Sequence, residues 1–356
     1  MGRSPRRWRG GGGDDLDGPD ARKPISAGLA MLASAVLTSL AVALIAGFFL
    51  LIEANRPGPA GEKIVVIARG AAVSTIGRHL QEEGVIRSAS MFRFAAELYG
   101  KGGLKAGEYQ IPAKASLADV LRALAGGKVL FHGVTIPEGT TSAAAMELVR
   151  ANSVLTGDTP APPAEGAILP ETYVVERGMT RAEVVAQMLA ARERLLLDLW
   201  ANRAPDLPFE TPEEALTLAS IVEKETGLAG ERPMVAAVFV NRLRKGMRLE
   251  SDPTIIYGLT RGVPLGRGLR RSEIDQRTPY NTYQIPGLPP GPISNPGRAT
   301  IEAVLNPPPS EALFFVADGT GGHVFAASYK EHERNVAKWR ELERQRALAN
   351  TDAPAR

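Results

Sequence analysis

The stretch Leu216–Gly227, LTLASIVEKETG, reads as the end of a helix that carries one carboxylate on its buried face. Thr211 is placed to cap the start of this helix, and Gly227 is the expected stop. At about 100° per residue, Glu225 points in the same direction as the apolar stripe, whereas Glu223 points well away from it. The spacing therefore predicts that only Glu225 is aimed inward.

An inward glutamate in the last turn of a helix has two reasons to keep its proton. Burial disfavours the anion, and so do the free carbonyl groups at the end of the helix. A carboxylic acid that stays protonated near neutral pH is what a general acid needs. The structural alternative is that Glu225 pairs with a basic residue and only holds the fold together.

Composition allows a membrane anchor and two or three further modules within the 356 residues. The 42 basic and 39 acidic residues give a net charge of +3, which is too small to indicate a nucleic-acid partner. Cysteine is absent, and this excludes disulfides, thiolate metal sites and a cysteine nucleophile. The four histidines lack the spacing of metal ligands, so the sequence predicts neither a metal nor another cofactor.

The N-terminal region predicts a membrane anchor. Residues 1–24 form a polar tail expected to be disordered, and Ile25–Ile52 contains no charged residue over a length that exceeds the roughly 20 residues needed to cross a bilayer. A signal peptide has a shorter apolar core, and a buried core helix is disfavoured for so long an uncharged run. Basic residues precede the span: Arg3, Arg6, Arg7, Arg9, Arg22 and Lys23. The positive-inside rule then predicts a cytoplasmic N-terminus, with the chain after Glu53 outside.

The rest of the chain predicts an α+β protein. We expect a linker at 53–61, a small α+β module at 62–130, a connecting α/β subdomain at 131–210, a mixed α+β catalytic domain at 211–345 and a disordered tail at 346–356. The small module has the element order β-α-α-β and resembles the LysM fold, which binds glycan chains. Its expected elements are strands at Lys63–Ile67 and Gly107–Pro112 and helices at Ser74–Glu83 and Ser88–Tyr99.

Most of the candidate polar residues of the last domain lie in two segments that we expect to be loops, Ser251–Gly258 and Thr278–Gly297. The second segment is dense in proline and glycine, which excludes a regular helix or strand. A disordered linker is the alternative, but linkers avoid Tyr, Ile and Leu, and this segment contains all three. It therefore predicts a rigid, ordered wall.

From about Leu216 to Ser328 the sequence resembles the endolytic murein transglycosylase family, also called MltG or YceG-like. The pieces that carry this resemblance are ASIVEKET (Ala219–Thr226), VFVNRLRKGMRLESDPTIIYG (Val238–Gly258), YNTYQIPGLPPGPISNPG (Tyr280–Gly297) and FFVADGTGGHVF (Phe314–Phe325). The resemblance implies that Glu225 is catalytic. It further implies cleavage of the β-1,4 bond between N-acetylmuramic acid and N-acetylglucosamine in nascent peptidoglycan, on the outer face of the inner membrane. The product ends would be 1,6-anhydro-muramic acid, and the partners would be glycan strands and the peptidoglycan synthases (penicillin-binding proteins) whose strand elongation the cleavage terminates.

Other polar residues are candidates for the substrate cleft. Asp252 precedes Pro253 and is placed either to cap the next turn or to hydrogen-bond the site. For each candidate, packing or loop fixing is the alternative to sugar contact. The candidates are Asn241, Arg242, Arg248, Asp252, Tyr257, Tyr280, Asn281, Tyr283, Asn295 and His323.

Two other functions compete with the transglycosylase. One is a membrane-anchored glycan-binding scaffold without chemistry, in which the LysM-like module carries the function. The other is a hydrolytic muramidase that uses Glu225 and Asp252. The inward Glu225 beside an ordered wall favours an enzyme, because a scaffold has no use for a buried acid.

Overall fold

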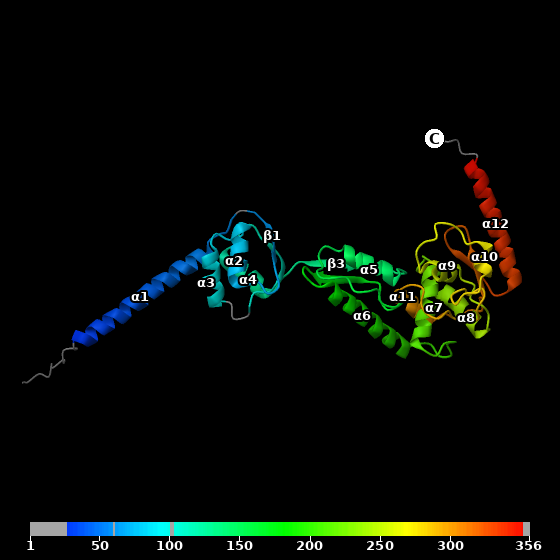
Figure 1. Cartoon of the computed structure of the whole chain (residues 1–356), viewed down its shortest axis with the longest axis horizontal. Coiled ribbons are helices and arrows are strands. Elements are labelled where there is room, and N and C mark those ends of the chain that lie inside the picture. Colours follow the sequence, from blue (N-terminus) through cyan, green and yellow to red (C-terminus); the bar gives the residue numbers. More distant parts are fainter. Residues whose placement is uncertain (1–26, 60, 100–102, 352–356) are drawn as a thin grey trace, which may run out of the picture.

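The computed structural model describes residues 27–59, 61–99 and 103–351, and this part of the chain is mixed α+β, as predicted. Figure 1 shows an elongated arrangement in which a long helix leads into a small unit, followed by two further units and a projecting C-terminal helix. Within the described residues, the strands form three separate two-stranded antiparallel sheets. The predicted N-terminal tail at 1–24 lies outside the described residues.

Helix α1 (Ala27–Asn55) is, within the described ranges, the one helix long and apolar enough to cross a membrane. Its large apolar side chains are exposed, with Phe48 at 62% and Leu44 at 67%. The helix runs three residues past Ile52 into the predicted linker, because no residue that breaks a helix occurs before Pro57.

The first unit contains β1 (Lys63–Ile67), α2 (Val73–Glu82), α3 (Ala89–Tyr99), β2 (Gly107–Ile111) and α4 (Leu117–Gly126). Its first four elements follow the predicted β-α-α-β order, and β1 pairs with β2 so that Lys63 lies opposite Ile111. Ser116 begins α4 through a capping box with Asp119. The unit has its own core, with Leu80, Phe92 and Leu124 fully buried. The likeness to LysM stays a prediction.

The second unit contains β3 (Phe131–Thr135), α5 (Ser142–Ala151), β4 (Thr172–Glu176) and α6 (Arg181–Ala201). Strands β3 and β4 pair antiparallel, and a separate apolar cluster that includes Met146 and Met188 fills the space between sheet and helices.

The third unit is organised around α7 (Pro212–Glu225), in which every residue from Ala215 to Val222 is buried. The other elements are α8 (Arg232–Arg244), α9 (Asp252–Thr260), α10 (Arg271–Asp275), α11 (Arg298–Leu305), β5 (Phe314–Ala317), β6 (His323–Ala326) and α12 (Tyr329–Thr351). Helices α6, α8 and α11 pack around α7 and surround it with the largest apolar cluster of the described chain.

Two expectations for this unit were wrong. The segment Ser251–Gly258 is not a loop but the start of α9, because Pro253 falls in the first turn, where a missing N–H group does no harm. Helix α12 continues to Thr351, past the boundary at which a disordered tail was expected. The segment 278–297 contains no regular helix or strand, as predicted, and it is ordered against α7.

Candidate functional site

The start of α7 follows the sequence prediction. Thr211 Oγ1 accepts a hydrogen bond from Glu214 N at 3.2 Å, and the Glu214 side chain accepts from Thr211 N at 3.2 Å, which completes a capping box. Pro212 is the first helical residue. The helix ends at Glu225, so this side chain lies at the C-terminal end of a buried helix.

Glu225 holds a buried carboxyl group whose hydrogen-bond partner is a hydroxyl. Ser251 Oγ donates to Glu225 Oε1. Burial raises the pKa of Glu225 from its ordinary 4.5 to about 7; the charge of Asp252 pushes the pKa up as well, while the Ser251 hydrogen bond, His323 and Arg242 act against the rise. The group is therefore able to carry a proton near neutral pH and to release it, as a general acid must.

Ser251 is itself held firmly in place. Its N–H donates to Thr282 Oγ1 at 2.9 Å, its carbonyl accepts from Thr254 Oγ1 at 2.6 Å, and the residue is 1% exposed. The proline-rich wall thus reaches the acid through Thr282. Sequence reasoning singled out Asp252 in this stretch and missed Ser251; the available signal was a serine directly before an Asp-Pro helix start.

Asp252 and Tyr283 lie beside the acid. Tyr283 Oη donates to Asp252 Oδ1 at 2.8 Å, and burial together with this hydrogen bond raises the pKa of Tyr283. Asp252 is the first residue of α9, and within the described residues the hydrogen bond found for its side chain is the one from Tyr283 Oη. Of the two roles that the sequence left open, the structure therefore gives Asp252 the polar contact near the site. Asp252 is exposed to solvent, and its charge influences Glu225.

His323, on β6, lies near enough to the acid to influence it and is fixed by Glu231. The His323 N–H donates to Glu231 Oε1 at 2.7 Å, and His323 Nδ1 lies 2.7 Å from Glu231 Oε2. Burial opposes ionisation of Glu231, but the hydrogen bonds from His323 outweigh it and lower the pKa of Glu231. The Phe315 ring meets the imidazole edge-on, with centroids 5.2 Å apart. Sequence reasoning missed Glu231, whose partner is far along the chain.

Arg242 is buried, and its guanidinium group binds backbone and side-chain acceptors of the protein instead of facing a ligand. Its Nε donates to Leu313 O at 2.7 Å, and its Nη1 donates to Leu249 O at 3.0 Å and to Glu250 Oε2 at 3.0 Å. It therefore ties the start of the C-terminal hairpin to the segment that carries Ser251.

Three predicted cleft residues fix loops in the structure. Asn241 Nδ2 donates to Ser310 O at 2.7 Å, Asn281 Nδ2 donates to Gln276 O at 2.6 Å, and Arg248 Nη1 donates to Tyr283 O at 2.8 Å. Asn281 is fully buried, which leaves it no surface for a sugar, whereas Arg248 is exposed at the rim near Tyr283.

Asn295 and the pair Tyr257 and Tyr280 also act in packing. Asn295 is fully buried and links the wall to the second unit, because its Nδ2 donates to Thr140 O at 2.9 Å and its Oδ1 accepts from Ile168 N at 3.0 Å. The rings of Tyr257 and Tyr280 pack with centroids 5.0 Å apart. Of the predicted set, the structure thus gathers Glu225, Asp252, Tyr283, His323 and Arg242 in one place.

Glu223 corrects the expectation that only Glu225 is aimed inward. Its side chain is 4% exposed and accepts from Gly297 N at 2.9 Å, Thr300 Oγ1 at 2.6 Å and Arg232 Nη2 at 3.3 Å. Helix α7 is packed on nearly every side, and the N-terminus of α11 lies where Glu223 points, so the buried surface of α7 is not a single apolar stripe. Glu223 is therefore ion-paired with Arg232 rather than solvated.

In the described ranges, no group of three or more His, Asp or Glu side chains is arranged to hold a metal ion.

Comparison with known proteins places the whole arrangement in a family. The YceG-like family model matches residues 65–338. The endolytic murein transglycosylase of Streptococcus pneumoniae serotype 2 (strain D39) is 30% identical over 344 residues, which cover 82% of this chain and 61% of the pneumococcal protein. The endolytic murein transglycosylase of Bacillus subtilis (strain 168) is 29% identical over 306 residues, covering 77% of this chain and 83% of that protein.

A crystal structure of a YceG-like protein from Listeria monocytogenes aligns with a TM-score of 0.47 and 28% identity, covering 77% of this chain and 99% of the other. The chain spans about three fifths of the length of its pneumococcal relatives. With a family model that matches most of its length, this chain belongs to the YceG-like family.

Proposed function

We propose that this chain is a membrane-anchored endolytic murein transglycosylase that cuts the β-1,4 bond between N-acetylmuramic acid and N-acetylglucosamine in nascent peptidoglycan. The observation that carries the proposal is Glu225, a buried carboxyl group with a pKa of about 7 at the end of α7. Two further facts support it: the relatives from S. pneumoniae and B. subtilis bear the name endolytic murein transglycosylase, and the family model includes Glu225.

Glu225 serves both proton transfers in this mechanism. As the acid, it donates its proton to the glycosidic oxygen while the bond from that oxygen to C1 of the muramic acid breaks. The C6 hydroxyl of the same sugar then bonds to C1, and the Glu225 carboxylate takes the C6 proton. The products are a free 4-hydroxyl on one fragment and a 1,6-anhydro end on the other, and Glu225 is protonated again.

The neighbours of Glu225 have supporting roles. Ser251 donates to the carboxylate and so stabilises the ionised form between the two proton transfers. Tyr283 and Asp252 form a polar edge that faces solvent and can meet sugar hydroxyls. Arg242 adds positive charge near the carboxylate once it is ionised.

A hydrolytic muramidase is the second candidate, and the position of Asp252 favours it. The negative charge of Asp252 contributes to the raised pKa of Glu225. Hydrolysis needs a water activated by a second carboxylate, and Asp252 is the candidate base. The transglycosylase mechanism needs no such base. Its nucleophile is the C6 hydroxyl of the same sugar, and a tethered hydroxyl of this kind reaches effective molarities of about 10⁵ M or more.

Mass spectrometry of products formed in ¹⁸O-water separates the two candidates. Glycan strands incubated with the full chain should yield ends that are lighter by one water than a reducing end and carry no label. Short oligomers should appear early, because the proposed cuts are internal. Labelled reducing ends as the main product would rule out the transglycosylase and favour the hydrolytic muramidase.

We also propose that α1 spans the inner membrane, with a cytoplasmic N-terminus and the catalytic unit in the periplasm beside the peptidoglycan synthases, where cleavage terminates strand elongation. The apolar length of α1 and the basic residues before it support this placement. A reporter that is active only in the cytoplasm, fused after Arg356, should be silent. A strong signal from it would contradict the placement.

A further inference from the structure

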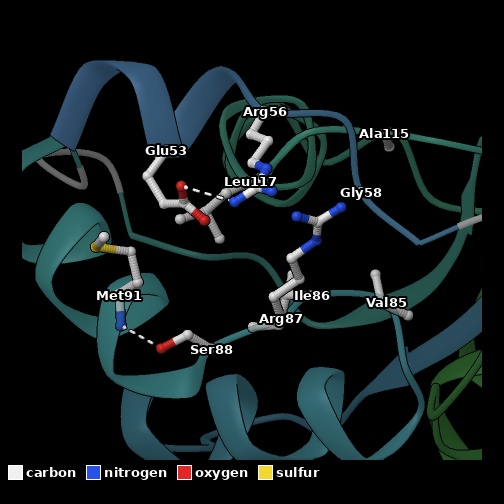
Figure 2. Close-up of a pocket in the computed structure, with 10 residues that line it drawn as sticks. All are labelled: Glu53, Arg56, Gly58, Val85, Ile86, Arg87, Ser88, Met91, Ala115 and Leu117. Carbon is white, nitrogen blue, oxygen red and sulfur yellow. Dashed lines mark hydrogen bonds and ion pairs between the residues drawn. The ribbon is translucent and has the colours of Figure 1, made fainter. Parts of the chain in front are cut away.

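A pocket of about 310 Å³ lies between the last turn of α1 and the first unit, and Figure 2 shows its lining. Arg56 follows the end of α1, and Arg87 stands in the turn that leads into α3. Both guanidinium groups face the same space, with Glu53 and Met91 at its sides. The pocket is therefore cationic at one side and apolar at the other.

The positive charge of this pocket is only partly neutralised. Arg56 Nη1 lies 3.5 Å from Glu53 Oε2, and both side chains are well exposed, so the pair is weak. In the part of the chain that the structure describes, the one protein acceptor recorded for the Arg87 guanidinium is Pro57 O, at 3.0 Å from Nη2. Most of its five N–H groups remain open to a ligand. A guanidinium fork of this kind suits a phosphate oxyanion.

Helix α3 presents an uncovered apolar face beside the same pocket. Phe94 is 48% exposed and Leu98 is 61% exposed, one turn apart. Met91 lines the cationic pocket, and Ala95 lines a second pocket of about 360 Å³ together with Leu51 of α1. Because these four α3 residues share one helix face, the exposed Phe94 and Leu98 lie on the side that adjoins α1. Figure 1 shows α3 on that side of the unit.

The position of the pocket along the chain points to its ligand. Glu53 is the first charged residue after the apolar run that ends at Ile52, so the pocket begins at the level where lipid headgroups lie if α1 spans the bilayer. Residues 53–130 contain 11 basic and 7 acidic residues, whereas the whole chain has a net charge of only +3. An excess of positive charge next to a span suits an anionic lipid surface.

We propose that the first unit rests on the outer surface of the bilayer, with Phe94 and Leu98 in the headgroup–acyl boundary and Arg56 and Arg87 on the phosphate groups of anionic phospholipids. This inference rests on the proposed anchoring by α1 but not on the proposed cleavage. Two attachments, α1 and the α3 face, would fix the orientation of the elongated chain, so that the Glu225 unit points away from the membrane (Figure 1).

Site-directed spin labelling tests this placement, because the chain contains no cysteine to compete for the label. The full chain is reconstituted in nanodiscs that contain phosphatidylglycerol, with a nitroxide at Phe94→Cys or Leu98→Cys. Labels at Leu40→Cys, in the middle of α1, and at Ile64→Cys, on exposed β1, report lipid and water respectively. Collision rates with oxygen and with a water-soluble nickel complex are measured at each position.

The expected result is lipid-like accessibility at 94 and 98, intermediate in depth between 40 and 64. Arg87→Gln should shift the equilibrium between docked and undocked units about fivefold toward undocked, the effect expected of one cationic side chain at an anionic surface. Lys128→Gln removes the same charge beside the chain that leads into β3 and should have little effect. Arg87→Lys keeps the charge and should dock almost normally, which separates lost charge from a folding defect.

Three results would overturn the proposal. Water-like accessibility at 94 and 98 with lipid-like accessibility at 40 would show anchoring without docking. Water-like accessibility at 40 would remove the anchoring and the docking together. Release of labels 94 and 98 into water on addition of inorganic phosphate, with sulfate at equal ionic strength having no effect, would assign the arginines to a soluble phosphate. Activity on glycan strands is not a readout, so failure of the cleavage proposal leaves this test intact.

Discussion

The last turn of α7 carries two carboxylates that stand in contrasting surroundings. Glu223 accepts hydrogen bonds from the Arg232 guanidinium, from the Thr300 hydroxyl and from the N–H of Gly297, the N-cap residue of α11. Glu225, two residues on, has within the described chain one recorded hydrogen-bond partner, the hydroxyl of Ser251. Both side chains are withdrawn from water. The comparison teaches that the partners, rather than burial alone, decide whether a buried carboxylate serves the fold or holds a proton for chemistry.

Replacing the acid should have the largest effect. Glu225→Gln keeps the shape of the side chain and removes the transferable proton, so cleavage should fall by about 10²–10⁴ or more, because one group serves both proton transfers. Glu223→Gln is the matched control, two residues away on the same turn. Release of soluble glycan fragments measures both variants, and their circular dichroism checks the fold. Equal losses of activity in two folded variants would contradict the contrast between the two residues.

Removing the structural carboxylate should act on stability. Glu223→Ala leaves Gly297 N, Thr300 Oγ1 and part of the Arg232 charge without their buried partner. The free energy of unfolding of the third unit should drop by about 3–4 kcal/mol, as for other broken buried ion pairs. Urea titration of the detergent-solubilised chain measures the change. An unchanged midpoint would mean that this network does not stabilise the unit.

Removing the Glu225 carboxyl should raise stability at high pH, whereas removing the Glu223 carboxylate should lower it. Because the pKa of Glu225 is raised from 4.5 to about 7 on folding, the folded state binds more protons than the unfolded state between these values, and stability falls as pH rises through that window. Glu225→Gln removes this cost and should stabilise the unit by about 3 kcal/mol at pH 8. At pH 4 the variant and the parent should unfold alike. Thermal melts at the two pH values measure the difference, and a variant that is less stable at pH 8 would argue against a raised pKa.

Sequence reasoning reached Glu225 because the relevant signals are local. The capping box at Thr211 sets where α7 begins and is confirmed. Helical spacing gives the direction of Glu225, and the burial that raises the pKa of this residue agrees with it. It misjudged Glu223 because α7 is buried on polar sides too: Ser220 Oγ, for example, accepts from Ile293 N at 2.9 Å. A packed helix of this kind has no single inward face.

The rest of the site depends on contacts between distant segments. Ser251 and Glu225 are 26 residues apart, and Glu231 and His323 are 92 apart, so no periodic pattern joins them. The Asp-Pro-Thr stretch resembles a loop in composition but begins helix α9, because proline is tolerated in the first turn of a helix. The rigid wall at 278–297 was predictable from its tyrosines and aliphatic residues, but its attachment to Ser251 through Thr282 was not.

The two nearest neighbours of the acid should give the smallest effects, with opposite signs. Ser251→Ala removes a donor to the carboxylate, so the pKa of Glu225 should rise and the alkaline limb of kcat/KM should move to higher pH. Asp252→Asn removes a negative charge, so the same limb should move to lower pH. Rate profiles from pH 5 to 9 measure both shifts. If Asp252→Asn instead abolished cleavage at every pH, the hydrolytic mechanism would gain support.

Carboxyl ¹³C NMR of the chain labelled at the δ-carbon of glutamate tests the central claim most directly, because it follows the proton itself. The chain is titrated beside Glu225→Gln and Glu223→Gln. One resonance should titrate with a midpoint near 7, disappear in Glu225→Gln and persist in Glu223→Gln. If the resonance lost in Glu225→Gln instead titrates near the ordinary 4.5, Glu225 does not hold a proton at neutral pH and the account of α7 is wrong.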